Sequence, residues 1–533
     1  MKNRREFLAA AAAVTLTARL HANTRLPQVS MPTPPGAPTF KTKLTVSRTR
    51  RSTIPANFIG LSYESQQLTD PEFFTPANKK LVAQFKALAL NGVLRLGGNT
   101  SEFSWWKPTP TSTQPPRTQR ASIPGEPQTD LAYPITPAAI DNLRKFLNAT
   151  GWTCIYGLNL GNGITSPALV AEEAAYVAAT LGPRLEYFQI GNEVDLFGRH
   201  IRNSETWNPA VFYPEWLTLA RAVMERVPTA AFGAPDVTNH FEWMSAFSVS
   251  IASTPNPPKI AAITHHHYVG GPPDSPRMTI PVILAGAKED KVIDQAAEIA
   301  KAAAAELKTA FRMTEGNTCY RGGKPGVSDV FAASLWSADY LLYLASLGYA
   351  GVNLHGGDAK AVANSLGGTL PGELLMKNPN EPHPKPFYTP IAHIGSDYVA
   401  EPVFYGMLFA GQFAGATLLD IDFNPLYTPA GSTKSVVANV TAFAALRPDG
   451  KTIVAIINKD VTNDVMLHLE GIAPSDVLRL AASAPDARDV TFARASVTPN
   501  GVWNPRPEQA VIAYKHNLPI RIPRASAALI VSR

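Results

Sequence analysis

Two glutamates in this chain have the setting of a catalytic carboxylate pair. Glu193 and Glu315 lie 122 residues apart, and each closes an apolar, strand-like run at a Gly/Asn break. We therefore expect each at the carboxyl end of a β-strand. Cleavage of a glycosidic bond requires such a pair, because one carboxyl group protonates the leaving oxygen while the other attacks the sugar or activates water.

Eight strand-like runs predict the scaffold that would bring these glutamates together. Most pairs of successive runs are separated by a segment with the apolar spacing of a helix, such as residues 78–90. Strand and helix alternating eight times is typical of a (β/α)8 TIM barrel, which predicts an α/β catalytic domain over residues 56–413. The runs are 58–63, 93–97, 153–160, 185–191, 230–234, 260–267, 309–314 and 351–354.

The pattern changes after residue 413. Short strand-like runs separated by turns favour a C-terminal antiparallel β-sandwich over residues 414–533. The segment 41–55, which precedes the barrel, also has strand character, and we expect it to join the sandwich. The runs after the barrel are 435–446, 452–458, 465–469, 477–482, 490–493, 509–514 and 527–531.

The N-terminus has the pattern of an export signal. The pair Arg4-Arg5 precedes a short apolar run, so residues 1–22 are predicted to be a twin-arginine-type signal peptide. The run is too short to span a bilayer, and we expect no membrane association. Because of the predicted signal peptide, we expect a periplasmic or secreted protein. Residues 23–40, which follow it, have the Pro-rich composition of a linker.

Charge and cysteine content exclude some other classes of protein. The formal net charge is only +6 over 533 residues, with no stripe of Lys and Arg, so nucleic acid is not an expected partner. Two cysteines, Cys154 and Cys319, make neither a disulfide framework nor a zinc box. We expect no cofactor.

The neighbours of the two glutamates fit a sugar site. Glu193 ends the fourth expected strand and Glu315 the seventh, and the carboxyl ends of barrel strands meet at one rim. Asn192 offers donors and an acceptor to a sugar hydroxyl. Arg95 ends the second strand, where an inward guanidinium would keep the nucleophile ionised. A retaining mechanism needs carboxyl groups about 5–5.5 Å apart.

The sixth strand ends in three histidines followed by a tyrosine, at residues 265–268. A zinc site is the alternative, but successive side chains on a strand point to opposite faces, and no partner carboxylate occurs at metal spacing. We therefore expect no metal. One or two of the histidines, with His266 among the candidates, and Tyr268 are expected to line the pocket and hydrogen-bond the reacting groups.

Taken together, these motifs resemble a known group of retaining glycosidases. Gly191-Asn192-Glu193 and Thr314-Glu315 resemble the clan whose carboxylates lie on strands four and seven. More narrowly, the chain is similar to glycoside hydrolase family 79, the β-glucuronidases and heparanases, in the manner of a bacterial β-glucuronidase. The likeness covers about residues 58–413 and rests on 94–99, His266-His267-Tyr268, Tyr320-Arg321-Gly322-Gly323, and 328–333 with Trp336.

The resemblance implies roles for individual residues. Glu193 would be the acid/base and Glu315 the nucleophile, with Tyr268 in contact with the nucleophile. Glu64 and Asn99 match family positions that touch sugar hydroxyls.

The segment after the nucleophile would recognise a uronic acid. By resemblance, Tyr320 and the glycine backbone of Gly322 and Gly323 would bind the uronate carboxylate. The physical chemistry agrees, because Arg321 and Lys324 add positive charge and the glycines let the N–H groups of the turn converge on an anion. A neutral sugar has no need of such a turn.

We therefore expect a retaining, exo-acting β-glucuronidase that hydrolyses terminal β-D-glucuronic acid from glycans or glucuronides. One alternative is another retaining exo-β-glycosidase of the clan, such as a β-xylosidase or β-glucosidase. A second is a non-catalytic carbohydrate-binding barrel. The aglycone, the tolerance of a 4-O-methyl group, endo against exo action, the signal cleavage site and the oligomeric state are left open.

Overall fold

The computed structural model describes residues 38–533, except 118–120, 123–127, 162–164, 379–382, 430, 473–474 and 509–516. The predicted signal peptide, nearly all of the predicted linker and the predicted strand at 509–514 therefore lie outside the described residues. Among the described residues, no helix has both the length and the apolar character needed to cross a bilayer.

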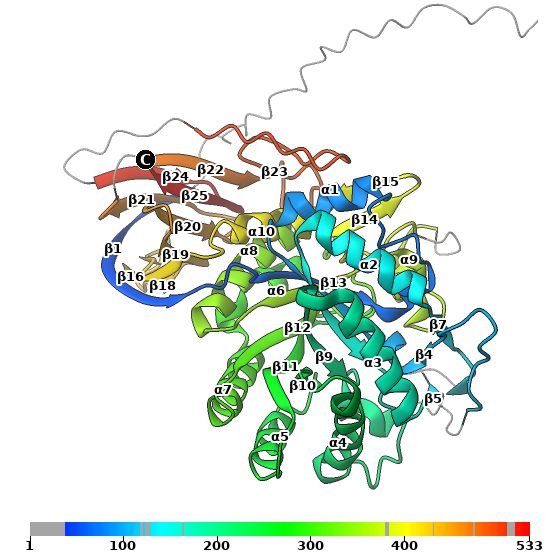
Figure 1. Ribbon diagram of the computed structural model, residues 1–533. Coiled ribbons are helices and arrows are strands. Elements are labelled where there is room, and N and C mark those ends of the chain that lie inside the picture. The colour runs from blue at the N-terminus through cyan, green and yellow to red at the C-terminus, as the bar shows by residue number, and fades with distance from the viewer. Residues whose placement is uncertain are drawn as a thin grey trace, which may run out of the picture. The chain divides into compact units, whose positions relative to one another are not determined.

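Eight parallel strands form a closed barrel, which confirms the predicted fold class (Figure 1). They follow one another around the barrel in chain order, and the last pairs with the first. Each of the eight runs predicted from the sequence is one of these strands. They are β2 (Ile59–Glu64), β3 (Val93–Gly97), β8 (Thr153–Leu158), β9 (Leu185–Ile190), β10 (Ala231–Val237), β11 (Lys259–Gly270), β12 (Ala310–Cys319) and β13 (Val352–Gly356).

Helices separate successive barrel strands and surround the barrel (Figure 1). Several begin with proline at the first helical position, where its missing N–H costs nothing, and Ser166 caps one of them by accepting from the N–H of Leu169. The helices are α1 (Lys79–Leu88), α2 (Pro137–Thr150), α3 (Pro167–Leu181), α4 (Pro209–Arg226), α5 (Glu242–Ala252), α6 (Ile280–Leu284), α7 (Lys291–Glu306), α8 (Phe331–Leu347), α9 (Ala359–Asn364) and α10 (Pro402–Gly411).

Strand β12 is longer than the sequence suggested. The Gly316-Asn317 break was expected to end it after Thr314, yet the strand continues to Cys319. The neighbouring strand β11 also runs on, and the ladder pairs His267 with Gly316 and carries the pairing beyond it. The extended partner therefore overrides the local turn signal, and Glu315 lies inside a strand rather than at its end.

The C-terminal domain is built on a nine-stranded, mostly antiparallel sheet. The segment expected at 41–55 forms β1, which pairs antiparallel with β16 and parallel with β21, and Figure 1 shows it among the C-terminal strands. The strands are β1 (Thr39–Thr53), β16 (Thr417–Phe423), β19 (Val440–Leu446), β20 (Thr452–Asn458), β21 (Asp464–Glu470), β22 (Ser475–Ala481), β23 (Thr491–Phe492), β24 (Asn517–Ile522) and β25 (Ser526–Ser532).

Two halves of this sheet share one core. Leu44 of β1 and Leu467 of β21 belong to the same buried cluster as Ile456 of β20 and Ile530 of β25. The sheet folds so that two parts of its inner face pack against each other, which gives the two layers expected of a sandwich. The sequence did not mark β16 and β24.

The remaining elements are short and lie in loops. Strand pairs are β4 (Ser104–Trp106) with β7 (Tyr133–Ile135), β5 (Ala121–Ser122) with β6 (Gln128–Thr129), β14 (Ile391–Ile394) with β15 (Asp397–Ala400), and β17 (Leu426–Tyr427) with β18 (Val436–Val437). The 3-10 helices are η1 (Ser65–Thr69), η2 (Asn99–Phe103), η3 (Gly182–Arg184), η4 (Val194–Arg199), η5 (Ala287–Glu289) and η6 (Pro371–Leu375).

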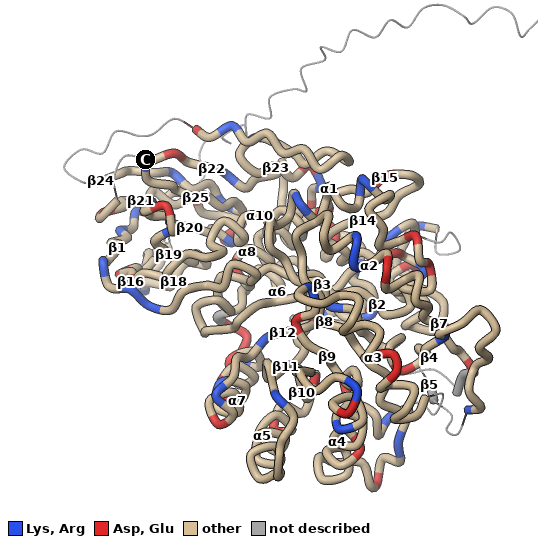
Figure 2. Tube along the Cα trace, in the orientation of Figure 1, with Lys and Arg blue, Asp and Glu red and all other residues tan. Residues whose placement is uncertain are grey.

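Charged residues of both signs are interspersed along the described chain (Figure 2). This mixture agrees with the modest net charge of the sequence.

Candidate active site

Glu193 and Glu315 meet at the carboxyl rim of the barrel. Glu193 follows β9 and caps η4, with its backbone in the left-handed region at φ 49°. Its N–H donates to the carbonyl of Asp236 at 2.9 Å, which ties this turn to the end of β10. One carboxylate oxygen of each glutamate and one ring nitrogen of His266 all lie within 4.8 Å of one another. The two carboxyl groups can therefore act on the two atoms of a single substrate bond.

Glu315 is held as a carboxylate by its neighbours. Arg95 Nη1 donates to its Oε2 at 2.7 Å, and the Tyr268 hydroxyl donates to its Oε1 at 2.8 Å. Burial by itself would raise the pKa of this carboxyl group, but the charges of His355, His266 and Arg95 outweigh it and lower the pKa to about 2. Glu315 is therefore ionised at neutral pH.

Glu193 has the opposite electrostatic setting. Burial is the largest influence and raises the pKa of Glu193, and the charge of Glu315 raises it further. His266, whose Nδ1 lies 3.1 Å from Glu193 Oε1, opposes this rise only in part. Two adjacent carboxyl groups whose pKa values are pushed apart make a proton donor beside an ionised partner.

A buried ion network connects the two glutamates. His266 Nε2 lies 3.1 Å from Oδ2 of Asp236, and Arg95 Nη2 donates to the same oxygen at 2.7 Å. Burial would lower the pKa of His266, but Asp236 and Glu315 raise it to about 10, so the ring is charged at neutral pH. Burial would raise the pKa of Asp236, but His266 and Arg95 lower it well below its ordinary value. Opposite charges thus alternate through the network.

Glu193, His266 and Glu315 also have the composition of a metal-binding trio. A charged imidazole has no lone pair for a metal, and both ring nitrogens of His266 already face carboxylates. The cluster therefore fits a proton-donating site better than a metal centre.

Asn192 is fixed through its side chain and its backbone. Arg95 Nη2 donates to its Oδ1 at 2.8 Å, and its Nδ2 donates to Oδ1 of Asn99 at 3.3 Å. Its N–H donates to Glu102 Oε1 at 3.0 Å, while the other Glu102 oxygen accepts two backbone N–H groups from the loop after β8. Glu102 therefore holds the turn that carries Glu193.

Glu64 lies at the end of β2 and is buried. Its Oε2 accepts from the N–H and the hydroxyl of Thr100 at 3.0 and 2.7 Å. Its Oε1 lies 3.4 Å from Nε2 of His355, and Nδ1 of that ring lies 3.7 Å from Glu315. His355 thus connects the predicted sugar-binding Glu64 to Glu315.

The turn at residues 320–324 has a glycine-dependent backbone. Arg321, Gly322 and Gly323 have φ values of 61°, 87° and 86°, three left-handed residues in succession. A Cβ on Gly323 would come within 2.7 Å of the backbone nitrogen of Tyr388. Phe387 donates its N–H to the Gly322 carbonyl at 2.8 Å, so the loop before β14 packs directly on the turn.

Tyr320 and Lys324, at the two ends of this turn, make different side-chain contacts. Tyr320 is 39% exposed, and its ring packs edge-on against Tyr268 at a centroid distance of 6.3 Å. Lys324 donates its N–H to Ser328 Oγ at 2.9 Å and its ammonium group to the Ser275 carbonyl at 3.2 Å. Tyr320 also donates its backbone N–H within the protein, to the Gly270 carbonyl at 3.2 Å, so the N–H groups at both ends of the turn are already committed.

Sequence reasoning missed several polar residues of the site. His355 directly follows the eighth predicted strand and Asp236 lies two residues beyond the fifth, so the strand-end rule would have found both. Glu102 lies in the 3-10 helix η2 and Tyr388 in a loop, and neither carries a comparable signal. The Tyr388 ring lies 6.4 Å from that of Tyr268 and 5.8 Å from that of His355, measured between ring centroids, so it packs at the centre of the site.

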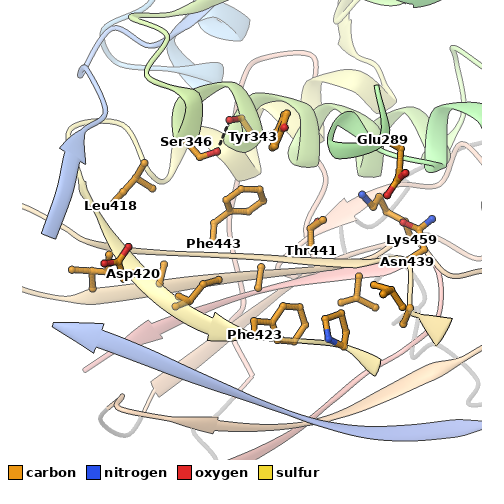
Figure 3. A pocket seen from close by; sticks show the side chains of 18 of the residues that line it. Glu289, Tyr343, Ser346, Leu418, Asp420, Phe423, Asn439, Thr441, Phe443 and Lys459 are labelled. Atoms are coloured by element: carbon orange, nitrogen blue, oxygen red, sulfur yellow. Dashed lines mark hydrogen bonds between the residues drawn. The ribbon is translucent and has the colours of Figure 1, made fainter. Parts of the chain in front are cut away.

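A cavity of about 560 Å³ lies elsewhere, between the barrel helices and the sheet domain (Figure 3). Tyr343 of α8 and Thr441 and Asn439 of the sheet domain line it. Beside it, Lys459 and Asp339 form a buried ion pair at 2.6 Å that joins the two domains. Its polar groups thus serve the contact between domains, and within the described chain its lining is separate from the predicted site.

The fold belongs to the class of (β/α)8 barrels with an appended sheet domain, which is shared with solved glycoside hydrolases. A 4-O-α-L-rhamnosyl-β-D-glucuronidase from Fusarium oxysporum matches with a TM-score of 0.65 and 15% identity, over 92% of this chain and 100% of that chain. A family 51 arabinofuranosidase from Xanthomonas axonopodis pv. citri matches with a TM-score of 0.63 and 16% identity, over 92% and 100%. These likenesses concern the fold alone.

Two curated proteins are more similar in sequence. The chain is 26% identical over 289 residues to a β-glucuronidase from Aspergillus niger and 27% identical over 293 residues to a β-glucuronidase from Neurospora crassa. Each match covers 50% of this chain, and the chain spans about half the length of the curated relatives it matches. No family model matches the chain.

Proposed function

We propose that the protein is a retaining, exo-acting β-glucuronidase with the characteristics of glycoside hydrolase family 79. The observation that carries this proposal is the approach of one carboxylate oxygen of Glu193 to within 4.8 Å of one of Glu315. So close an approach supports attack by one carboxylate on the sugar, because an inverting enzyme holds its carboxyl groups farther apart to admit a water molecule. The raised pKa of Glu193 and the lowered pKa of Glu315 support Glu193 as the acid/base and Glu315 as the nucleophile.

The reaction proceeds by double displacement. Glu315 attacks the anomeric carbon of the terminal sugar while Glu193 donates its proton to the leaving oxygen. The bond from the sugar to the leaving group breaks, and a covalent ester with Glu315 forms. Glu193, now a carboxylate, takes a proton from water, whose oxygen attacks the anomeric carbon and releases Glu315. Two inversions return the β-anomer.

The surrounding charges support both steps. Arg95 and Tyr268 keep Glu315 ionised and oriented before attack. Once the ester forms, the negative charge of Glu315 is gone, so one influence that raised the pKa of Glu193 disappears. Glu193 then loses its proton more readily, which suits its change from acid to base.

The turn at residues 320–324 supports glucuronate as the sugar. Three successive left-handed residues bring backbone groups together beside Tyr268, which touches the nucleophile. Such concave backbone turns bind anions. The two curated β-glucuronidases of similar sequence point the same way. A β-xylosidase or a β-glucosidase would have no use for an anion-binding turn. A non-catalytic carbohydrate-binding barrel would have no use for the glutamate pair.

The test compares release of nitrophenol from the β-glucuronide, β-glucoside and β-xyloside. We expect the glucuronide to be strongly preferred, and NMR of the first product to show the β-anomer. Preference for a neutral sugar would contradict the proposed substrate but not the proposed mechanism. An α-anomer as first product would overturn the mechanism, and no turnover of any glycoside would favour a binding protein.

Three further expectations accompany this proposal. The enzyme acts on carbohydrate outside the cytoplasm after export by the twin-arginine-type signal at residues 1–22. Its chemistry uses side chains alone, without a metal or cofactor. Glucuronides with and without a 4-O-methyl group belong in the same assay, which measures whether the site accepts the methylated sugar.

A further inference from the structure

A buried serine, Ser328, holds the C-terminal end of the turn at residues 320–324 through hydrogen bonds. Ser328 Oγ accepts the N–H of Lys324 at 2.9 Å, and the N–H of Ser328 donates back to the Lys324 carbonyl at 2.9 Å. The Thr318 hydroxyl, at the end of β12, donates to the same Ser328 oxygen at 2.9 Å. The Ser328 side chain thereby joins Lys324, the last residue of the turn, to the strand from which the turn begins.

The next residue, Asp329, links this segment to the sheet domain. Its carboxylate accepts the N–H of Gly326 at 2.6 Å and forms an ion pair with Arg488, and Arg488 Nε also donates to the Asp329 carbonyl at 3.3 Å. The Asp329 side chain is fully buried, whereas Arg488 is 61% exposed. A buried carboxylate depends strongly on its partners, so Arg488 fixes Asp329 more firmly than a pair of surface charges would.

The same loop of the sheet domain also caps a barrel helix. Phe331 and Ala332, the first residues of α8, donate their N–H groups to the carbonyls of Ala487 and Pro485, both at 2.8 Å. The first N–H groups of a helix have no partner within the helix, and here the sheet domain supplies two acceptors. Residues 324–332 are therefore held between the end of β12 and residues 485–488.

We propose that Arg488 of the sheet domain is a positioning residue for uronate recognition, acting through Asp329 on the turn at residues 320–324. The inference rests on the proposed function, because it concerns how that site binds its carboxylate. Arg488 does not touch the sugar. It fixes the residues from which the turn extends, so the sheet domain contributes to substrate specificity as well as to the stability of the barrel.

The experiment compares Arg488→Ala with Arg488→Lys and a matched control, Arg533→Ala. Arg533 pairs with Asp476 at 2.9 Å in the same domain and is similarly exposed, at 57%. Kinetics are measured on nitrophenyl β-glucuronide and on dinitrophenyl β-glucoside, whose reactive leaving group makes slow turnover of a neutral sugar measurable. Hydrogen exchange of the peptide covering residues 320–328 reports on the turn without relying on activity.

For Arg488→Ala we expect the KM for the glucuronide to rise about five- to tenfold with kcat within about twofold of wild type. The glucoside kinetics stay unchanged, and exchange at residues 320–328 becomes faster. Arg488→Lys, which keeps one charged donor, restores part of the KM, and Arg533→Ala behaves as wild type.

Two outcomes overturn the proposal. Arg488→Ala could match Arg533→Ala in both kinetics and exchange, or it could lower turnover of both substrates equally, which would mean a role in stability alone. Failure of the proposed function is a separate result: the wild-type protein would then not hydrolyse the glucuronide, while the exchange comparison would still report whether Arg488 holds the turn.

Discussion

His266 Nδ1 lies 3.1 Å from Oε1 of Glu193, while its Nε2 lies 3.1 Å from Oδ2 of Asp236. A single imidazole ring therefore connects Glu193 at the rim with a buried aspartate on the fifth barrel strand. Because the pKa of His266 is raised to about 10, the ring stays charged over the range in which the glutamates titrate. The protonation state of Glu193, which follows the fourth barrel strand, thus depends on His266, which lies on the sixth.

Replacement of Glu315 by glutamine should abolish turnover and leave the fold intact. The amide keeps the shape of the side chain but cannot form the covalent ester, so kcat should fall by at least about a thousandfold. Glu225→Gln, at an exposed position on α4, is the control and should keep full activity. A near-native rate for the Glu315 variant would falsify the nucleophile assignment, provided circular dichroism shows both variants folded.

Replacement of His266 by asparagine should move the pH profile of kcat/KM to higher pH. Activity needs Glu315 ionised and Glu193 protonated, so the rate is lost as pH falls through the pKa of Glu315, about 2, and as pH rises through the raised pKa of Glu193. His266 lowers the pKa of both groups, so its loss raises both and shifts both limbs upward.

The rate of the His266 variant should also fall about ten- to a hundredfold, because the proton donor loses its orienting partner. His267→Asn is the control, since His267 contacts Tyr340 and Asp290 rather than a catalytic group. Unchanged limbs in the His266 variant would contradict this account of the site.

Replacement of Asp236 by asparagine should destabilise the protein. It leaves the buried charges of Arg95 and His266 with one carboxylate fewer, which should lower the free energy of unfolding by about 3 kcal/mol. The pKa of Asp236 is lowered on folding, so its stabilisation is present above its ordinary value of 3.8 and is lost as pH falls toward the folded value. The difference from wild type should therefore narrow on acidification.

Urea unfolding at several pH values measures this effect. Asp420→Asn serves as the comparison, because Asp420 pairs with Arg51 at the surface and should contribute less than about 1 kcal/mol. If the two variants lost equal stability at neutral pH, Asp236 would not be holding the buried charges in place.

Replacement of Gly323 by alanine should impair glucuronide binding selectively. The new Cβ would meet the backbone nitrogen of Tyr388 at 2.7 Å, and φ is 86°. Because the turn must shift, the KM for the glucuronide should rise at least about tenfold. An alanine in the left-handed region without a clash should lower stability by about 1–2 kcal/mol through backbone strain alone. Gly368→Ala, at φ 105° with open space around it, isolates that strain and should leave KM within about twofold. Equal KM values for the two variants would rule out a role for this close contact.

Local patterns in the sequence were enough to predict the barrel. Parallel strands buried on both faces give short apolar runs, and amphipathic helices give a different period, so all eight strands could be placed. The placement of Glu193 and Glu315 at one rim followed from expecting each at the carboxyl end of its strand, although β12 continues past Glu315 to Cys319. Glycines at 322 and 323 likewise indicated the left-handed turn, since other side chains rarely adopt that backbone.

Only the tertiary structure decided which of these residues touch. Arg95, Asp236 and His266 come from three different strands, and their contacts depend on the stagger with which the barrel closes, which no local pattern encodes. The extension of β12 past Gly316 and the pairing of β1 with β21 were set by partner strands distant in the sequence. The contact of Arg488 with Asp329 joins residues 159 positions apart. Side-chain periodicity reports what one element buries, whereas a site is made where several elements converge.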